Sequence, residues 1–356
     1  DSLDEMDETI LATLEVSQEE IPMSDVEVDS DLTMAEMNAK GLAAILDGDS
    51  IVAANSYFEA SSAKAGTESS NDADAAKLFH AITRVAALGF NIESDGDTTD
   101  GFKTVGDFID ATGCDTDMRT SWEMVSCPDV KTTAGKEKLA SSAPTSEDLR
   151  AFLHDALIPE IAAALVELGE ITSTFTTHVT HKDKNYNIDY SDALVVKGYY
   201  QAMLSQLYGI SAFNVNVNIY DAIKNDKSVE TLKSENTDFL KLGSCGTECL
   251  TNAKTNYLAA LSTLTEAVKE IGAESTGTDE ELFTIDSSDP LPTVTASKAT
   301  SAFDSLKTAA DGSVDISSIG NTFSLNLSSL FAGTLDLNSL LPAVSGNNVD
   351  TNKVDW

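Results

Sequence analysis

The spacing of apolar residues predicts that most of the chain is helical. Between residues 33 and 65, apolar and small residues recur three and four positions apart, as on one face of a helix. The turn sequence "DGD" at 47–49 divides this stretch into two helices, and Ser50 is well suited to cap the second. Residues 72–89 continue the same period and predict a third helix.

Longer helical patterns follow in the second half of the chain. Residues 145–171 predict a helix that begins with a capping box of Thr145 and Asp148, and Pro159 should kink its middle. Another helix is expected to begin near residue 189 or 191 and to end near residue 212. A further helix follows Cys249, and its apolar residues form one buried stripe. These residues are Leu250, Tyr257, Leu261, Leu264, Val268 and Ile271.

Two other parts of the chain alternate between apolar and polar residues, as half-buried strands do. Residues 9–16 have apolar residues at every second position, which predicts a strand without a hairpin partner nearby in sequence. Three short pieces near the other end, at 313–316, 322–327 and 334–337, also predict strands.

The predicted fold is therefore mainly α, with a small β element from the N-terminal strand and the C-terminal segment. We expect an acidic extension over residues 1–30 that contains a candidate donor strand. A helical domain over residues 31–272 follows. Residues 273–356 should form a linker, a short helix and a small β-rich segment.

The first two predicted helices resemble a tetratricopeptide (TPR) unit. Gly41, Gly48, Ala54 and Phe58 stand where such a unit has its small residue in the first helix, its turn glycine and its packing residues in the second. Met37 stands where the family has an aromatic residue, and the closing proline is absent. The resemblance implies TPR-like helical hairpins in a short module, since no further 34-residue period appears.

The sequence "LFAGTLDLNSLLPAVSGN" near the C-terminus resembles the closing segment of a group of secreted or lipid-anchored bacterial proteins with TPR-like helices. That group brings no established activity. The chain departs from its lipid-anchored members, because the first residue is Asp1 where those members carry a lipidated cysteine.

The charge is strongly acidic. The 22 Lys and Arg residues against 59 Asp and Glu residues give a net charge of −37. Such a surface repels nucleic acids and anionic membranes and attracts divalent cations. Adaptation to a salty or alkaline medium explains the same charge. No run of 18 apolar residues is present, so we expect no membrane span.

The cysteines point to an oxidising compartment. Cys114 and Cys127 enclose 12 residues, and Cys245 and Cys249 enclose three, which predicts two local disulfides. A zinc site is less favoured, because no histidine follows at ligand spacing. A first residue that is not Met, with no charged and apolar leader, is expected of a chain whose signal peptide has been removed. We therefore expect an extracellular or cell-surface protein.

The stretch "HKDKNYNIDYSDA" at 181–193 carries oxygen-bearing side chains at alternate positions, the pattern of a calcium loop. The candidate ligands are Asp183, Asn185, Asn187, Asp189 and Asp192. An EF-hand is excluded, because Ile188 and Leu194 occupy the positions of its glycine and bidentate glutamate. The alternative is that Asp189, Ser191 or Asp192 only caps the next helix.

Weaker candidate sites lie elsewhere. Asp95, Asp97 and Asp100 form a second candidate calcium cluster, and Asp115 and Asp117 a poorer one. His178 and His181 have a spacing that zinc sites use, but no catalytic glutamate or third histidine accompanies them. Asn214, Asn216 and Asn218, with Asp221 beyond them, are further candidate metal ligands, but amide ladders or capping explain them equally well.

No nucleophile elbow, P-loop or dinucleotide fingerprint is present, so we expect no enzyme. The sequence favours a secreted structural subunit that assembles with copies of itself, stabilised by calcium and joined by strand exchange. Residues 9–16 would be the donor, and an open edge of the C-terminal strands, especially Phe323–Leu327, the acceptor. The alternative is a periplasmic or cell-surface TPR-like module that binds a peptide or protein partner.

Overall fold

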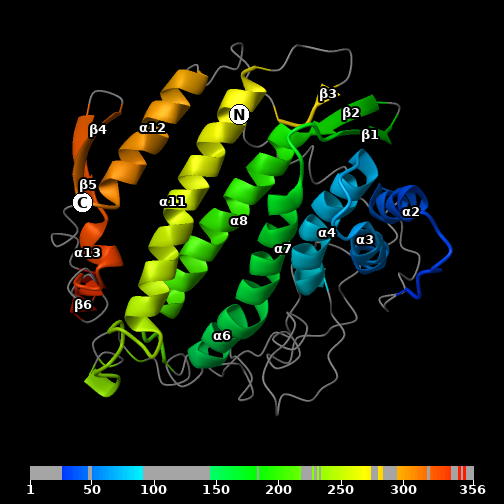
Figure 1. The fold of residues 1–356 in the computed structure, drawn as a ribbon. Helices are drawn as coiled ribbons and strands as arrows, with labels where there is room; N and C mark the ends of the chain where they lie inside the picture. Colours follow the sequence, from blue (N-terminus) through cyan, green and yellow to red (C-terminus); the bar gives the residue numbers. More distant parts are fainter. Residues whose placement is uncertain are drawn as a thin grey trace. The chain divides into compact units, whose positions relative to one another are not determined.

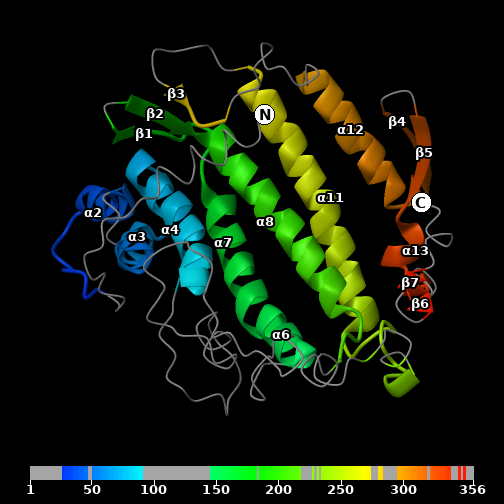
Figure 2. The ribbon, with the colours of Figure 1, turned by 180° about the vertical axis from the view of Figure 1, so that it is seen from behind.

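The computed structural model describes residues 26–46, 50–90, 145–182, 184–217, 227, 231, 234–273, 280–283, 295–318, 321–337, 344–345 and 348–349. It divides the chain into two compact units, which are described here one at a time (Figures 1 and 2). The helices predicted as one domain over residues 31–272 fall into both units. Within the described segments, no helix combines the length and apolar character that a membrane crossing requires.

Among the described residues, the first unit contains three helices. They are α2 (Met34–Leu46), α3 (Ile51–Ala65) and α4 (Asn71–Phe90). All three were predicted from the apolar spacing, and the predicted cap of α3 is present, since Ser50 Oγ accepts a hydrogen bond from Ala53 N–H at 3.1 Å. Helix α3 packs against both α2 and α4, which makes it the centre of this unit.

Gly41 and Phe58 set how closely α2 and α3 approach. Phe58 is fully buried, and its ring lies 5.2 Å from the ring of Phe79 on α4, measured between centroids. A Cβ atom added to Gly41 would lie only 2.6 Å from Phe58 Cζ. The aromatic ring therefore occupies the space that a side chain on α2 would fill.

Buried polar side chains fasten the short segment 170–175 to α4 within this unit. Asp74 is almost fully buried, and its Oδ2 accepts hydrogen bonds from the Thr172 backbone N–H and hydroxyl, at 3.1 and 2.5 Å. Lys77, also buried, forms an ion pair with Glu170 at 3.1 Å. Buried charges need such partners, so this polar contact fixes where the segment runs.

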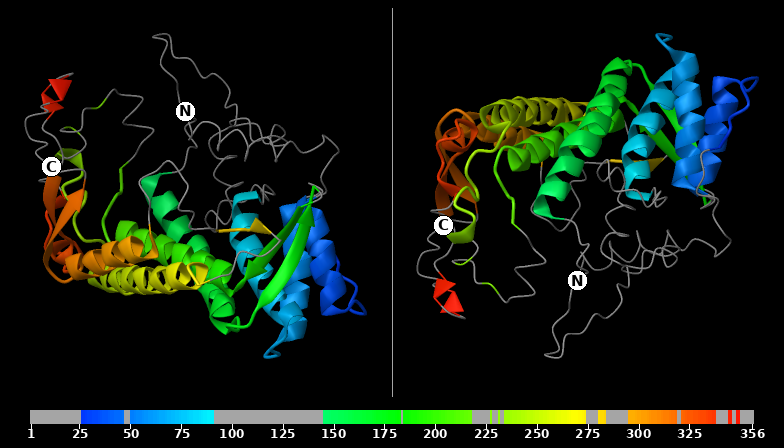
Figure 3. Two further views of the ribbon diagram at one scale, coloured as in Figure 1. Left: turned by 90° about the horizontal axis from the view of Figure 1, so that it is seen from above. Right: turned by 90° about the horizontal axis from the view of Figure 1, so that it is seen from below.

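The described part of the second unit is mainly helical, with long and short helical segments. They are α6 (Ser146–Phe152), η2 (Leu153–Leu157), α7 (Ile158–Glu170), α8 (Tyr190–Ser211), α11 (Gly246–Ile271), α12 (Ala296–Ala309) and the short α13 (Ser328–Phe331). Helix α11 lies between α8 and α12 and contacts both (Figures 1 and 3). Of the predicted stripe on α11, Leu250 and Leu261 are buried, whereas Tyr257, Leu264, Val268 and Ile271 are only half-buried.

The segments α6, η2 and α7 follow one another without a break, and η2 is a π-helical turn. The Ile158 N–H bonds to Leu153 O, five residues back, directly before Pro159. Proline has no N–H and crowds the carbonyl four residues earlier, so a wider turn at this place accommodates its ring. A kink was expected at Pro159, and the structure has a π-turn directly before this residue.

Helices α8 and α11 approach each other closely at Gly198. An added Cβ at this position would lie 2.7 Å from both Cγ and Cδ2 of Leu264 on α11. Leu204 and Leu207 on α8 are buried as well. A residue without a side chain at 198 therefore lets two helices of 22 and 26 residues pack closely.

Small sheets complete the second unit. Strand β1 (Thr176–His181) pairs antiparallel with β2 (Lys184–Asp189), which pairs parallel with β3 (Glu280–Glu281). Two separate hairpins follow. They are β4 (Ser313–Ser318) with β5 (Asn321–Asn326), and β6 (Val344–Ser345) with β7 (Asn348–Val349).

The mainly α fold with a small β element is confirmed, and so are the strands predicted at 313–316 and 322–327. The strand predicted at 334–337 is wrong, since residues 334–336 have no regular structure. The N-terminal strand predicted at 9–16 lies outside the described residues. The hairpin β1–β2 was not predicted.

The contact at Gly198 yields a matched pair of substitutions on one helix. Gly198→Ala should lower the free energy of unfolding by about 1–3 kcal/mol, because the methyl group meets Leu264 in a filled interior. On the same helix, a Cβ atom added at Gly209 would meet no other atom within 4 Å. Gly209→Ala should therefore raise the free energy of unfolding by about 0.5–1 kcal/mol, because alanine has the higher helix propensity. Urea unfolding of both variants measures the difference. A Gly198→Ala variant as stable as the parent would contradict the packing described for α8 and α11.

Tyr200 on α8 makes stability depend on alkaline pH. It is 7% exposed, and burial raises its pKa from 10.0 to about 12. The phenol therefore ionises first in the unfolded chain, so stability should fall as pH rises from 10 towards 12, by about 2–3 kcal/mol. Tyr200→Phe should remove this contribution to the alkaline loss, whereas Tyr199→Phe, at a position 61% exposed, should keep it. Equal alkaline loss in the parent and in Tyr200→Phe would show that Tyr200 is not its source.

Candidate functional site

The stretch predicted to be a calcium loop is mostly a strand. Residues 184–189 form β2, paired in register with β1 from His181↔Lys184 to Thr176↔Asp189. The prediction of a loop over 183–192 is therefore wrong for these residues. Asp183 lies outside the described residues, next to Lys182, whose φ of 48° places it in the left-handed region of a tight turn.

The amides of β2 bond to neighbouring strands. Asn185 Oδ1 accepts from Thr180 Oγ1 at 2.7 Å, and Asn187 Oδ1 accepts from Thr176 Oγ1 at 3.0 Å. Asn187 Nδ2 donates to Glu281 Oε2 on β3 at 3.1 Å. Alternate residues of a strand lie about 6.6 Å apart, so these side chains are spread along the sheet and do not surround one point.

Asp189 and Asp192 form the N-terminal cap of α8. Asp189 Oδ1 accepts from the Ser191 N–H at 2.8 Å, and Asp192 Oδ2 accepts from the Asp189 N–H at 2.9 Å. Asp192 is only 3% exposed, which fits a structural role. The capping alternative is thus confirmed for this helix, while calcium binding by the stretch stays a prediction.

The other candidate metal ligands either lie outside the described residues or do not face one another. Asp95, Asp97, Asp100, Asp115 and Asp117 lie outside the described residues. His178 and His181 stand three positions apart on β1, so they belong to opposite faces of the strand and do not share a site. Across the described part of the chain, no group of three or more His, Cys, Asp or Glu side chains is placed to hold a metal ion.

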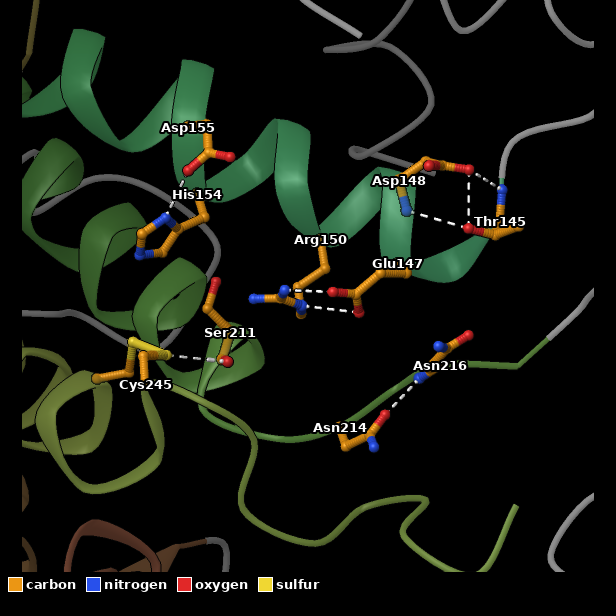
Figure 4. A network of polar contacts seen from close by, with 11 residues as sticks. Thr145, Glu147, Asp148, Arg150, His154, Asp155, Ser211, Asn214, Asn216 and Cys245 are labelled. Atoms are coloured by element: carbon orange, nitrogen blue, oxygen red, sulfur yellow. Dashed lines mark hydrogen bonds and ion pairs between the residues drawn. A yellow bond between two sulfur atoms is a disulfide. The ribbon is translucent and has the colours of Figure 1, made fainter. Parts of the chain in front are cut away.

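Figure 4 shows the polar contacts near the start of α6 and the end of α8. Thr145 and Asp148 form the predicted capping box, and Arg150 pairs with Glu147. Asn214 Oδ1 accepts from the Asn216 N–H at 2.9 Å, which is the local capping that the sequence left open for this asparagine run. These contacts are structural.

Cys245 and Cys249 form the predicted disulfide at the beginning of α11. Cys249 is buried in a cluster with Ala212, Phe213 and Leu250, and Cys245 Sγ lies 3.2 Å from Ser211 O. The bridge closes a short loop, so it constrains the unfolded chain less than a bridge across a longer loop would. The predicted Cys114–Cys127 pair lies outside the described residues.

The β4–β5 hairpin has two different faces. Val314 and Leu325 oppose each other in register and are half-buried, whereas Ser313, Asp315, Ser324 and Asn326 are exposed. Ser313 Oγ and Ser324 Oγ share a hydrogen bond of 2.5 Å on the polar face. Helix α12 supports the hairpin by packing on β4, and the Leu327 N–H, just after β5, donates to Ala309 O at 2.8 Å.

The hairpin differs from the helices around it in having strand edges at which backbone groups can bind another strand. Among the described residues, β4 and β5 pair only with each other. An edge strand presents unpaired N–H and C=O groups, which can bind an added strand. The sequence predicted both strands and favoured an open edge on them, and the topology leaves their outer edges unpaired within the described part.

No family model matches this chain, and comparison with curated proteins and with solved structures also finds no match. The hairpin, the disulfide and the charge are therefore the features of this chain that bear on its function.

Substitutions at Asp189 separate capping from calcium binding. Asp189→Ala should lower stability by about 1 kcal/mol, and Asp189→Asn should change it little, because asparagine caps as well as aspartate. If the stretch also binds calcium, the parent should melt higher with calcium than with EGTA. Asp183→Asn combined with Asp189→Asn should remove that shift while keeping the cap. Equal melting temperatures of the parent in both conditions would reject calcium binding and leave the cap alone.

Proposed function

We propose that this chain is a secreted structural subunit that assembles with copies of itself by strand exchange. The observation that carries the proposal is the amphipathic β4–β5 hairpin, whose outer edges meet no third strand among the described residues. The proposed donor is the segment 9–16, which the sequence predicts to be a strand.

The donor matches the hairpin in its pattern. In β4 and β5 an apolar, half-buried row alternates with a row of exposed serine, asparagine and aspartate. In the donor, Ile10, Ala12, Leu14 and Val16 alternate with residues that include Thr9, Thr13 and Glu15. An added strand would therefore extend both the apolar and the hydroxyl-rich face, and Leu11 is the exception on the polar side.

The energetics favour an added strand. A hairpin of two strands is marginally stable in water, and a third strand with an apolar face adds both hydrogen bonds and burial. Each backbone hydrogen bond contributes about 0.5–1.5 kcal/mol net, so several of them with three or four apolar side chains can hold two subunits together. Because donor and acceptor are different parts of the chain, the contact is head-to-tail and can propagate into a fibre.

The charge sets the conditions for assembly. Subunits with a net charge of −37 repel one another, so assembly should need salt or divalent cations that reduce this repulsion. Calcium is the cation that we propose, since carboxylate and carbonyl oxygens are its ligands. The Cys245–Cys249 disulfide supports the proposed extracellular or surface location.

One observation favours the alternative function, a TPR-like module that binds a peptide or protein partner. Gly41 on α2 lies against the buried ring of Phe58 on α3, and these are two of the residues on which the TPR resemblance rests. Helix α4 packs on the same helix pair. Gly48, the expected turn glycine, lies outside the described residues.

Deletion of the N-terminal segment, and single charged substitutions within it, test the proposed assembly. Light scattering in calcium should find polymers of the full chain and monomers of a variant that lacks residues 1–18. Leu14→Asp places a charge on the apolar side of the donor and should also give monomers. Thr13→Asp adds the same charge on the other side and should still polymerise.

A synthetic peptide of residues 1–18 should bind the shortened variant once per subunit and should block polymerisation of the full chain. Circular dichroism checks that every variant is folded. Polymers formed by the shortened variant would reject strand exchange. A full-length chain that stays monomeric at high concentration with calcium would reject assembly and favour the binding module.

A further inference from the structure

The end of β5 carries the sequence Asn326-Leu327-Ser328, the one Asn-x-Ser/Thr triplet in the chain. This triplet is the acceptor signal for N-linked glycans, and it is informative only where the asparagine is accessible in a secreted protein. Asn326 is exposed. It lies with Ser313 and Ser324 on the polar side of the hairpin.

The side chains of the triplet are already arranged in a compact turn. Asn326 Oδ1 accepts two hydrogen bonds from Ser328, one from its backbone N–H at 2.9 Å and one from its hydroxyl at 2.6 Å. Both donors are directed at the oxygen of the carboxamide, which leaves Nδ2 as the end of the side chain that can react.

This geometry bears on reactivity. A carboxamide nitrogen is a weak nucleophile, because its lone pair is delocalised onto the oxygen. Two donors on Oδ1 stabilise the negative charge that gathers there when Nδ2 loses a proton, in the way that oxyanion-stabilising donors act elsewhere. Ser328 therefore favours the form of Asn326 in which Nδ2 can attack carbon.

We infer that Asn326 is a site of N-linked glycosylation. Nδ2 forms a bond to the anomeric carbon of an oligosaccharide activated as a pyrophosphate ester. The bond from that carbon to the phosphate oxygen breaks, and the pyrophosphate leaves with the electron pair. The proton from Nδ2 passes to a base of the transferring enzyme, so no oxidant or reductant is needed.

The inference rests on the proposed secretion of the chain, but it does not depend on assembly. A glycan on Asn326 would extend from the polar face of the hairpin. Both outer edges, whose N–H and C=O groups point along the sheet, would stay accessible to an added strand. The glycan would also keep the polar faces of two sheets from stacking.

Mass spectrometry of the full chain, isolated from the medium or cell surface of its own host, tests the site. The peptide that contains Asn326 should carry the mass of a glycan. Digestion with a peptide-N-glycosidase in heavy-oxygen water should convert Asn326 to a labelled aspartate.

Variants made in the same host provide the controls. Asn326→Gln and Ser328→Ala should lose the added mass, whereas Ser328→Thr and Asn321→Gln, at the other end of β5, should keep it. Melting temperatures show whether each variant is folded. A peptide that carries unmodified Asn326 in every molecule of the parent overturns the inference. If Asn326→Gln loses the glycan but still polymerises, the proposed assembly is unaffected. If the variant that lacks residues 1–18 is monomeric but still carries the glycan, the inference about Asn326 is unaffected.

Discussion

The close contact between α8 and α11 is the constraint on which the second unit depends. Gly198 leaves room for Leu264, and this lets two helices pack along much of their length. Helix α12 lies on the other side of α11, and the β4–β5 hairpin is held by α12 and by the bond from Leu327 to Ala309. The disulfide fixes the first turn of α11. A firm helical layer therefore holds a small sheet at a defined place.

The helical layer and the small sheet offer a partner two different kinds of surface. Helices satisfy their own backbone hydrogen bonds, so a helical layer offers a partner only side chains. A two-stranded sheet keeps one row of backbone groups open on each strand, and these groups bind any strand of suitable pattern. The large negative charge opposes unwanted association, and it makes the proposed assembly respond to cations.

Much of the fold could be predicted because helices depend on local sequence. The period of apolar residues gave α2, α3, α4 and α11, and short capping motifs such as Thr145 with Asp148 marked where helices begin. The β1–β2 hairpin was missed although "THVTH" is rich in β-branched residues, because its polar second strand resembled a calcium loop. Its third strand, β3, comes from 94 residues further along the chain at Asn187–Glu281, a distance that no local pattern conveys. The sequence already favoured the C-terminal strands, especially residues 323–327, as the open edge, and the topology adds that β4 and β5 pair only with each other among the described residues.

Hydrogen exchange on the assembled protein tests the central claim most directly. If subunits join at the β4–β5 hairpin, backbone amides of residues 313–318 or 321–326 that are unprotected in the folded monomer should become protected in the polymer. Amides of residues 9–16 should become protected with them. If these segments exchange equally fast in both states while amides elsewhere slow down, subunits associate through another surface and the strand-exchange account is wrong.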